Sequence, residues 1–296
     1  MSPRVRAHLA LLTVALIYGA NYIIAREVMV KGYLSPKAFI WLRVTGASLL
    51  FLFTDRLTLS SERIERKDLL LLAVCALFGV ALNQLLFFMG LERTSPINAS
   101  IIMITTPMLV LIFAALLLKE RIRIIQVLGI LIGGAGAAML ILSKGKIALD
   151  RGDTLGNVFI LLNAMSYALY LVLVKRLMRK YRALTVIKGV FLTGWIYISL
   201  IAVPDLLDTA WSAMPGHIVA SIGYVILFTT FLAYLLTAWA IKHLSSGMVG
   251  AYIYLQPVFA TAFSYLFLSE VIHLNQLLSG VIIAIGVMLT GKRARH

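Results

Sequence analysis

Long apolar stretches separated by short polar breaks run along the whole chain. Their lengths are close to the about 20 residues that a helix needs to cross a bilayer. None of them shows the alternation of a membrane β-strand. Ten such stretches are present, at 9–25, 36–54, 69–91, 96–118, 124–142, 155–174, 183–203, 218–241, 244–268 and 274–291. The pattern therefore predicts an all-α integral membrane protein with ten transmembrane helices.

The composition supports this prediction. Hydrophobic residues make up 61% of the chain and charged residues 13%, against about 45–50% and about 25% in soluble domains. A water-soluble domain, a disordered chain and a secreted disulfide scaffold are thereby excluded. The single cysteine, Cys75, excludes an internal disulfide and a multi-cysteine metal site. We expect no metal and no cofactor.

The net charge of +15 does not indicate nucleic-acid binding, because no clustered basic face with interleaved aromatic residues accompanies it. It bears instead on the orientation of the protein in the membrane. With the N-terminus inside, 17 Lys and Arg fall in cytoplasmic segments and 8 in outer ones, if Lys242 is counted as outer. Basic loops mark the cytoplasmic side. We therefore expect an inner (plasma) membrane protein with both termini in the cytoplasm. The first stretch is expected to be a retained helix, since nine further stretches follow it.

The chain also matches itself when it is shifted by 150 residues. Residues 77–140 and 227–290 align without a gap and share 16 of 64 positions. The special matches are Ser95/Ser245, Pro107/Pro257, Glu120/Glu270, Gln126/Gln276 and Gly136/Gly286. The repeat predicts two five-helix units, 1–143 and 154–296, joined by an outer linker, 144–153. Because five is odd, the second unit would be inverted, as in many secondary transporters that work by alternating access.

The repeated motif resembles a known family. Leu118-Lys119-Glu120-Arg121-Ile122, followed by Gln126, Gly129 and Gly136, is similar to the closing motif of an EamA domain. It recurs as Leu268-Ser269-Glu270-Val271-Ile272, followed by Gln276, Gly280 and Gly286, and Tyr18-Gly19-Ala20-Asn21-Tyr22 in the first helix fits as well. The chain thus resembles the two-repeat transporters of the drug/metabolite transporter superfamily. The resemblance implies a transporter and not an enzyme, with amino acids, other metabolites and drugs all open as substrates.

Two charges fall inside predicted spans, Arg43 and Lys188, each in the second helix of its unit. A charge at the centre of a membrane helix costs about 2.5–3.5 kcal/mol, so both are candidates for function. If both face a cavity, they favour an anionic substrate; snorkelling to the headgroups is the alternative. All acidic residues and histidines lie in loops or near span ends. Their positions argue against an intramembrane enzyme and against proton-coupled export of cationic drugs.

Pro107 and Pro257 lie near the middle of the fourth and ninth stretches. Each removes a backbone hydrogen bond, and paired interruptions in two halves point to a transporter's binding site. We predict that they are hinges, with plain packing kinks as the alternative. Other candidates for the substrate cavity are Asn21, Asn83, Gln84, Asn98, Thr106, Asn163, Tyr167, Tyr254 and Gln256. Hydrogen bonding between helices is the alternative for each of these.

The sequence thus predicts a secondary transporter, an exporter or facilitator, of a small organic metabolite such as an amino acid or a related zwitterion or anion. A lipid or lipid-linked-sugar flippase of the same fold is one alternative, and an intramembrane enzyme is a more distant one. The expected partners are a small molecule and the bilayer, without nucleic acid. A monomer is compatible with this interpretation.

Overall fold

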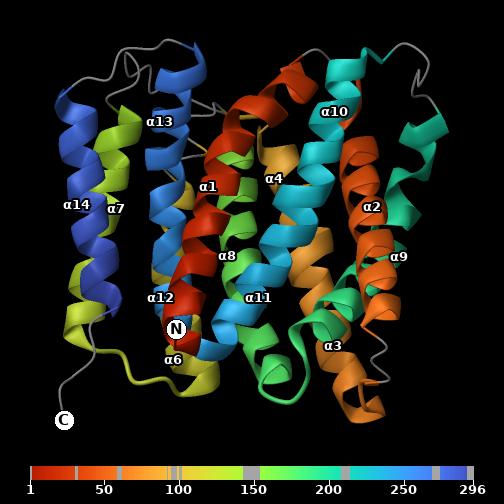
Figure 1. Cartoon of the computed structure of the whole chain (residues 1–296), viewed down its shortest axis with the longest axis horizontal. Coiled ribbons are helices and arrows are strands. Elements are labelled where there is room, and N and C mark those ends of the chain that lie inside the picture. The colour runs from red at the N-terminus through yellow and green to blue at the C-terminus, as the bar shows by residue number, and fades with distance from the viewer. Residues whose placement is uncertain are drawn as a thin grey trace.

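The computed structural model describes residues 2–30, 33–58, 62–91, 93–94, 99, 102–142, 154–207, 214–268 and 274–291. Every regular element in this part of the chain is helical (Figure 1). In the first half these are α1 (Pro3–Val30), α2 (Pro36–Leu57), η1 (Arg66–Asp68), α3 (Leu69–Ala76), η2 (Leu77–Ala81), α4 (Leu82–Leu91), α6 (Thr106–Leu118) and α7 (Ile124–Leu142). In the second half they are α8 (Thr154–Met178), α9 (Ala183–Leu207), α10 (Gly216–Tyr224), η4 (Val225–Leu232), α11 (Ala233–His243), α12 (Ser246–Ala251), η5 (Tyr252–Leu255), α13 (Gln256–Leu268) and α14 (Leu274–Gly291).

Within the described part of the chain, six helical segments are long and apolar enough to cross a membrane by length and composition: Pro36–Leu57, Arg66–Gly90, Ile124–Leu142, Thr154–Met178, Ala183–Ala202 and Gly216–His243. Two shorter apolar helices, Thr106–Leu118 and Leu274–Thr290, stand beside them. Large apolar side chains such as Leu200 and Leu116 lie exposed on the outer surface, which is the side that would face lipid. The chain is therefore an all-α integral membrane protein.

The long helices are interrupted at matching places in the two halves. The segments η2 and η4 are π-helical turns, and η2 shifted by 150 residues falls on 227–231, inside η4. Likewise, the 3-10 segment η5 corresponds to the turn that precedes α6. Pro107 and Pro257 each occupy the second position of the helix that follows the break. A proline is well tolerated there because the first turn of a helix does not need its N–H group. The prolines thus begin new helical segments.

Several contacts join a residue to its own counterpart in the repeat. The Trp195 indole N–H donates to the Thr45 hydroxyl at 3.0 Å, and the Tyr254 hydroxyl donates to the Ile104 carbonyl at 3.0 Å. Each of these pairs is separated by 150 residues. Where α7 packs on α14, a methyl group on Gly286 would overlap the Gly133 backbone, and one on Gly136 would lie 3.0 Å from the Ile283 side chain. The 150-residue shift turns Gly133 into Ile283 and Gly136 into Gly286, so each of these two contacts is the counterpart of the other.

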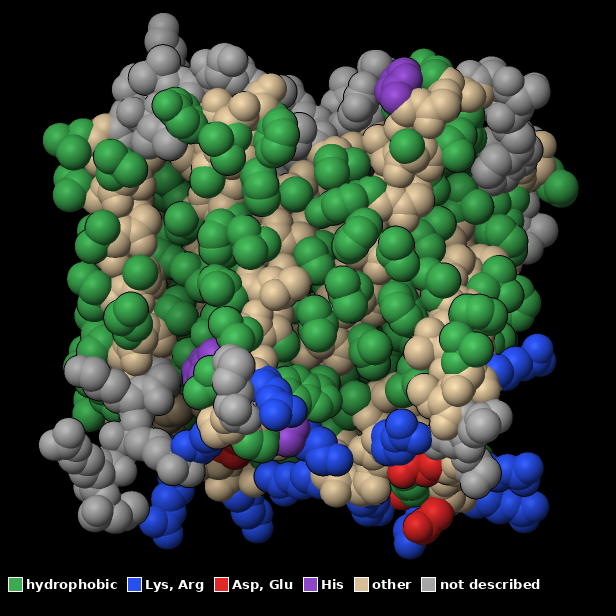
Figure 2. Space-filling view, viewed as in Figure 1, with side chains coloured by type: hydrophobic (Ala, Val, Ile, Leu, Met, Phe, Trp, Pro, Cys, Tyr) green, Lys and Arg blue, Asp and Glu red, His purple; other side chains and the backbone are tan. Residues whose placement is uncertain are grey.

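Lys and Arg side chains gather at one end of the molecule, the lower end in Figure 2. The last turn of α8 and the start of α3 lie there (Figure 1). Lys242, at the end of α11, belongs to this same end, because the nearby Leu244 carbonyl accepts a hydrogen bond from the Lys175 ammonium at 2.9 Å. The assignment of Lys242 to an outer segment was wrong. The ninth stretch starts where the eighth ends, on the basic side.

Candidate functional site

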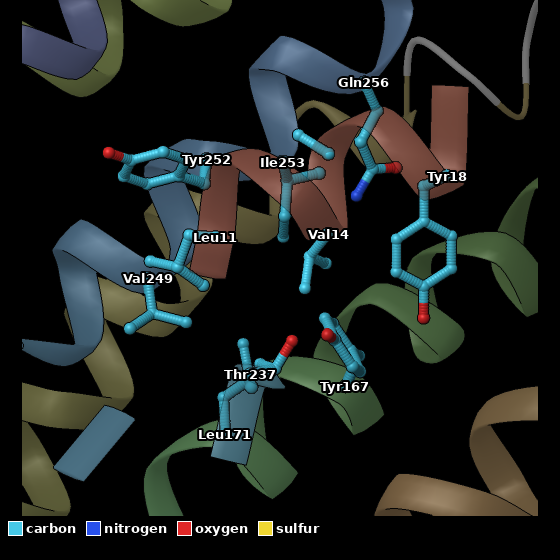
Figure 3. Close-up of a pocket in the computed structure, with 11 residues that line it drawn as sticks. Leu11, Val14, Tyr18, Tyr167, Leu171, Thr237, Val249, Tyr252, Ile253 and Gln256 are labelled. Carbon is cyan, nitrogen blue, oxygen red and sulfur yellow. The ribbon is translucent and has the colours of Figure 1, made fainter. Parts of the chain in front are cut away.

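A small pocket lies between the two halves of the chain (Figure 3). It is enclosed by α1, α8, α11, α12, η5 and the first residue of α13, and it is lined by Leu11, Val14, Ala15, Tyr18, Tyr167, Leu171, Thr237, Val249, Tyr252, Ile253 and Gln256. Its cavity volume is about 20 Å³, room for about one water molecule. The lining combines aliphatic residues with three tyrosines, one threonine and one glutamine, and the Tyr252 hydroxyl lies 2.9 Å from His8 Nδ1. A larger molecule could bind here only after the pocket opens.

Arg43 lies close to this pocket, on α2. Its Nε donates to the Thr230 hydroxyl at 3.2 Å, and its guanidinium carbon lies 5.6 Å from the centre of the Phe39 ring. Tyr18 and Tyr234 also lie near Arg43. Among the described residues, no carboxylate lies within ion-pair distance of it. Arg43 is thus a cation at membrane depth whose neighbours in the described part are hydroxyls and rings.

A group of four tyrosines connects Arg43 to the pocket. Tyr18 lies near Arg43, Tyr167 and Tyr234. The rings of Tyr167 and Tyr170 have centroids 6.1 Å apart, and those of Tyr170 and Tyr234 6.2 Å apart. The Tyr234 hydroxyl donates to the Gly79 carbonyl at 3.1 Å, inside the π-turn η2. The π-turn therefore directs a backbone carbonyl toward this group, as such turns often do at functional sites.

Two of the residues predicted from the sequence, Tyr167 and Gln256, line the pocket. Asn163 lies on the same helix as Tyr167, and its Nδ2 donates to the Asn83 carbonyl at 2.5 Å. The Asn21 amide oxygen accepts a hydrogen bond from the Thr229 hydroxyl at 3.4 Å.

The remaining predicted polar residues are distributed differently. Gln84 and Thr106 are buried without a hydrogen-bond partner for their side chains. Tyr254 is not among the residues that line the pocket, and its hydroxyl donates to the Ile104 carbonyl at 3.0 Å. Asn98 lies outside the described residues.

The structure does not bring Lys188 to this group. Its ammonium pairs with the Asp55 carboxylate at 2.5 Å, where the end of α2 meets the start of α9. At the opposite ends of these two helices, Lys37 pairs with Asp205 at 3.3 Å. Asp205 is the counterpart of Asp55 under the 150-residue shift. Lys188 therefore has its counterion and does not share the position of Arg43, whose counterpart is Thr193.

Sequence reasoning missed Tyr18, Thr237 and Tyr252 as pocket residues. The spacing of polar residues could have pointed to one of them, Thr237. Thr230, Tyr234 and Thr237 recur at spacings of four and three, which places them on one face of the segment formed by η4 and α11. Tyr18 stands beside Asn21 in the first-helix motif. Tyr252 gave no signal, because only the break at η5 turns it toward the pocket.

Glu120 has a structural role in the fold. Its carboxylate accepts hydrogen bonds from the Lys175 ammonium at 2.8 Å, the Ser246 hydroxyl at 3.2 Å and the Ser246 amide at 3.4 Å. Glu120 thus caps a backbone amide at the start of α12. Its counterpart Glu270 lies outside the described residues.

The described helices are those of an integral membrane protein, with a small pocket lined by residues of both halves. The sequence profile described as the EamA-like transporter family matches the chain twice, over residues 5–142 and 154–292. The chain belongs to this family.

Relatives of similar length come from a bacterium, an archaeon and a plant. The uncharacterized transporter YyaM of Bacillus subtilis is 25% identical over 287 residues, covering 95% of this chain and 92% of the relative. An uncharacterized transporter of Archaeoglobus fulgidus is 27% identical, covering 96% and 97%. Protein WALLS ARE THIN 1 of Arabidopsis thaliana is 25% identical, covering 98% and 84%. One solved crystal structure superposes with a TM-score of 0.80 at 19% identity over 97% of this chain and 96% of the other, which shows the same fold.

Proposed function

We propose that this chain is a secondary transporter of a small organic anion or zwitterion, such as an amino acid. It works by alternating access between two inverted five-helix repeats, 1–143 and 154–296, which together span the membrane ten times. The observation that carries the proposal is Arg43, a cation in the membrane interior with no carboxylate partner among the described residues, beside a pocket between the repeats. A buried unpaired charge is unfavourable, and a substrate carboxylate would supply the missing counterion.

The paired ion pairs support the inverted arrangement. Lys37 at the start of α2 pairs with Asp205 at the end of α9, and Asp55 at the end of α2 pairs with Lys188 at the start of α9. Asp55 and Asp205 are exact counterparts under the 150-residue shift, Lys37 and Lys188 each fall one residue from the other's counterpart, and the two pairs lie at opposite ends of the helix pair. An operation that swaps the two ends of a membrane protein is a twofold axis in the membrane plane, as in inverted-repeat transporters. The contacts of Thr45 with Trp195 and of Ile104 with Tyr254 would lie on this axis.

The charge distribution gives the orientation. The basic end of the molecule in Figure 2 would face the cytoplasm, since Lys and Arg accumulate on that side of membrane proteins. Both termini would then be cytoplasmic, and the linker 144–153 would lie outside.

Transport requires the nearly closed pocket to open toward each side in turn. The breaks at η5 and before α6 are natural places for such movement, because their backbone hydrogen bonds are already interrupted. Pro107 and Pro257 follow these breaks directly and would act as hinges. Tyr167 and Gln256 would contact the substrate within the pocket.

Uptake by purified protein in liposomes tests this function. A panel of radiolabelled amino acids, hydroxy acids, simple carboxylates and uncharged analogues is offered to the wild type, Arg43→Gln and a control, Lys242→Gln. A hydrogen bond to a charged group contributes about 1.5–3 kcal/mol, so Arg43→Gln should slow uptake of acids about tenfold or more. Lys242 is exposed at the end of α11, and its variant should match the wild type. Uptake of uncharged analogues only, or equal uptake by Arg43→Gln, would contradict the proposal.

A further inference from the structure

The Gln84 side chain is buried, at 4% exposure, yet neither its amide nitrogen nor its amide oxygen has a hydrogen-bond partner among the residues that the structure describes. It lies in the first turn of α4, directly after the π-turn η2. An unpaired buried amide is costly, and the great majority of buried polar groups in proteins are paired. A residue of this kind needs a reason, and a bound molecule that completes its hydrogen bonds would provide one.

Helix geometry places Gln84 at the level of Arg43. The rings of Phe88 on α4 and Phe39 on α2 meet edge to face, with centroids 6.2 Å apart. The two helices run in opposite directions (Figure 1). Gln84 is one turn before Phe88, and Arg43 is one turn after Phe39. Because the helices are antiparallel, both residues lie one helical turn from the aromatic pair, toward the same end of the molecule. The contact of the Arg43 guanidinium with the Phe39 ring keeps that cation on this face of α2.

A third polar side chain reaches the same level from α8. The Asn163 Nδ2 donates to the carbonyl of Asn83, the neighbour of Gln84, while its Oδ1 has no partner and the residue is 2% exposed. Tyr167, one turn further along α8, lines the pocket. Three helices therefore bring a cation and unpaired amide groups together next to the pocket.

We propose that Gln84 is a specificity-determining residue of the transporter. It recognises an amino or hydroxyl group on the carbon next to the substrate's carboxylate, while Arg43 holds the carboxylate itself. This inference rests on the proposed role of Arg43 and adds the second recognised group. An amide offers one acceptor and two donor hydrogens, so it can pair with either substituent. A simple carboxylate would leave the buried amide unpaired, and sites of this kind reject analogues that lack the group they bind.

The test compares three four-carbon acids: butyrate, 2-hydroxybutyrate and 2-aminobutyrate. Binding is measured as the ligand-induced shift in thermal unfolding and as inhibition of uptake in liposomes, for the wild type, Gln84→Leu, Arg43→Gln and Ser48→Ala. Ser48 on α2 is the matched control, because its hydroxyl is also buried and unpartnered. The wild type and Ser48→Ala should prefer the substituted acids over butyrate by about tenfold or more. Gln84→Leu should bind butyrate as well as the wild type does and lose that preference.

The ligand-free melting temperature separates recognition from a structural role. Removing an unpaired buried amide should raise it in Gln84→Leu, whereas loss of a structural contact would lower it. A lower melting temperature, or an undiminished preference in Gln84→Leu, would overturn the role of Gln84 while leaving that of Arg43 intact. Failure of the wild type to bind any of the three acids, or equal binding by Arg43→Gln, would instead refute the proposed function on which this inference rests.

Discussion

Lys175 ties the two halves together at the basic end of the molecule, and its removal should be costly. Its ammonium contacts the Glu120 carboxylate at 2.8 Å, the Leu244 carbonyl at 2.9 Å and the Ser246 hydroxyl at 3.4 Å. The Lys175 side chain is 9% exposed and that of Glu120 is 24% exposed. Removing one partner of a buried ion pair costs about 3–5 kcal/mol. Because water partly reaches Glu120, we expect about 3 kcal/mol for Lys175→Met, the lower end of that range.

This loss can be measured with a thiol-reactive dye, since Cys75 is the sole cysteine and is fully buried in the fold. At about 2 °C per kcal/mol for a chain of this size, Lys175→Met should melt about 6 °C below the wild type. Lys175→Met with Glu120→Gln should recover part of this loss, because no charge is then stranded. Exposed Lys242→Met is the control and should not shift. A melting temperature for Lys175→Met within about 1 °C of the wild type would refute this reasoning.

Three further predictions concern the helix packing, the hinges and one surface ion pair. Gly286→Leu should lower the melting temperature by several degrees, because its side chain would overlap the Gly133 backbone, whereas Gly280→Leu, which meets only Val258 at 3.7 Å, should be tolerated. Pro107→Ala and Pro257→Ala should bias the pocket toward opening on opposite sides of the membrane. A shift of about 1.4 kcal/mol would change the ratio of the inward-open and outward-open states about tenfold. If both variants change the accessibility of the pocket from the same side, the prolines are not paired hinges. The Ser35 hydroxyl and the Lys37 ammonium hold the pKa of Asp205 below its usual value. The ionised Asp205 carboxylate should therefore stabilise the fold above about pH 4, and this stabilisation should be lost as the pH falls further. In Asp205→Asn, the stability of the fold should consequently depend less on pH on the acid side.

The positions of the helices could be predicted from the sequence because the membrane imposes a simple apolar pattern. The stretch 124–142 coincides with α7, and the stretch 36–54 begins at the first residue of α2, where the Ser35 hydroxyl accepts from the Ala38 amide at 3.1 Å. The π-turns η2 and η4 were not foreseen, since a local change of hydrogen-bond register leaves the apolar pattern unaltered.

The site was harder to predict than the fold. Lys188 and Arg43 look alike as charges within apolar stretches, and only the packing of α2 on α9 shows that Asp55 neutralises one of them. Tyr18 and Thr237 are amphipathic residues in largely apolar helices. Whether such a residue faces lipid, a neighbouring helix or a pocket depends on tertiary contacts.

The central claim is that the pocket between the repeats opens alternately to the two sides of the membrane. Val14 lines that pocket and is buried, so a cysteine at this position, with Cys75→Ala as the background, reports its access to water. The account predicts that an impermeant thiol reagent labels Val14→Cys from either side. A disulfide between cysteines replacing Glu120 and Ser246, whose side chains meet at 3.2 Å, should block labelling from the cytoplasm and preserve it from outside. Labelling of the disulfide-free protein from one side only, or unchanged labelling from the cytoplasm once the disulfide has formed, would contradict alternating access at this site.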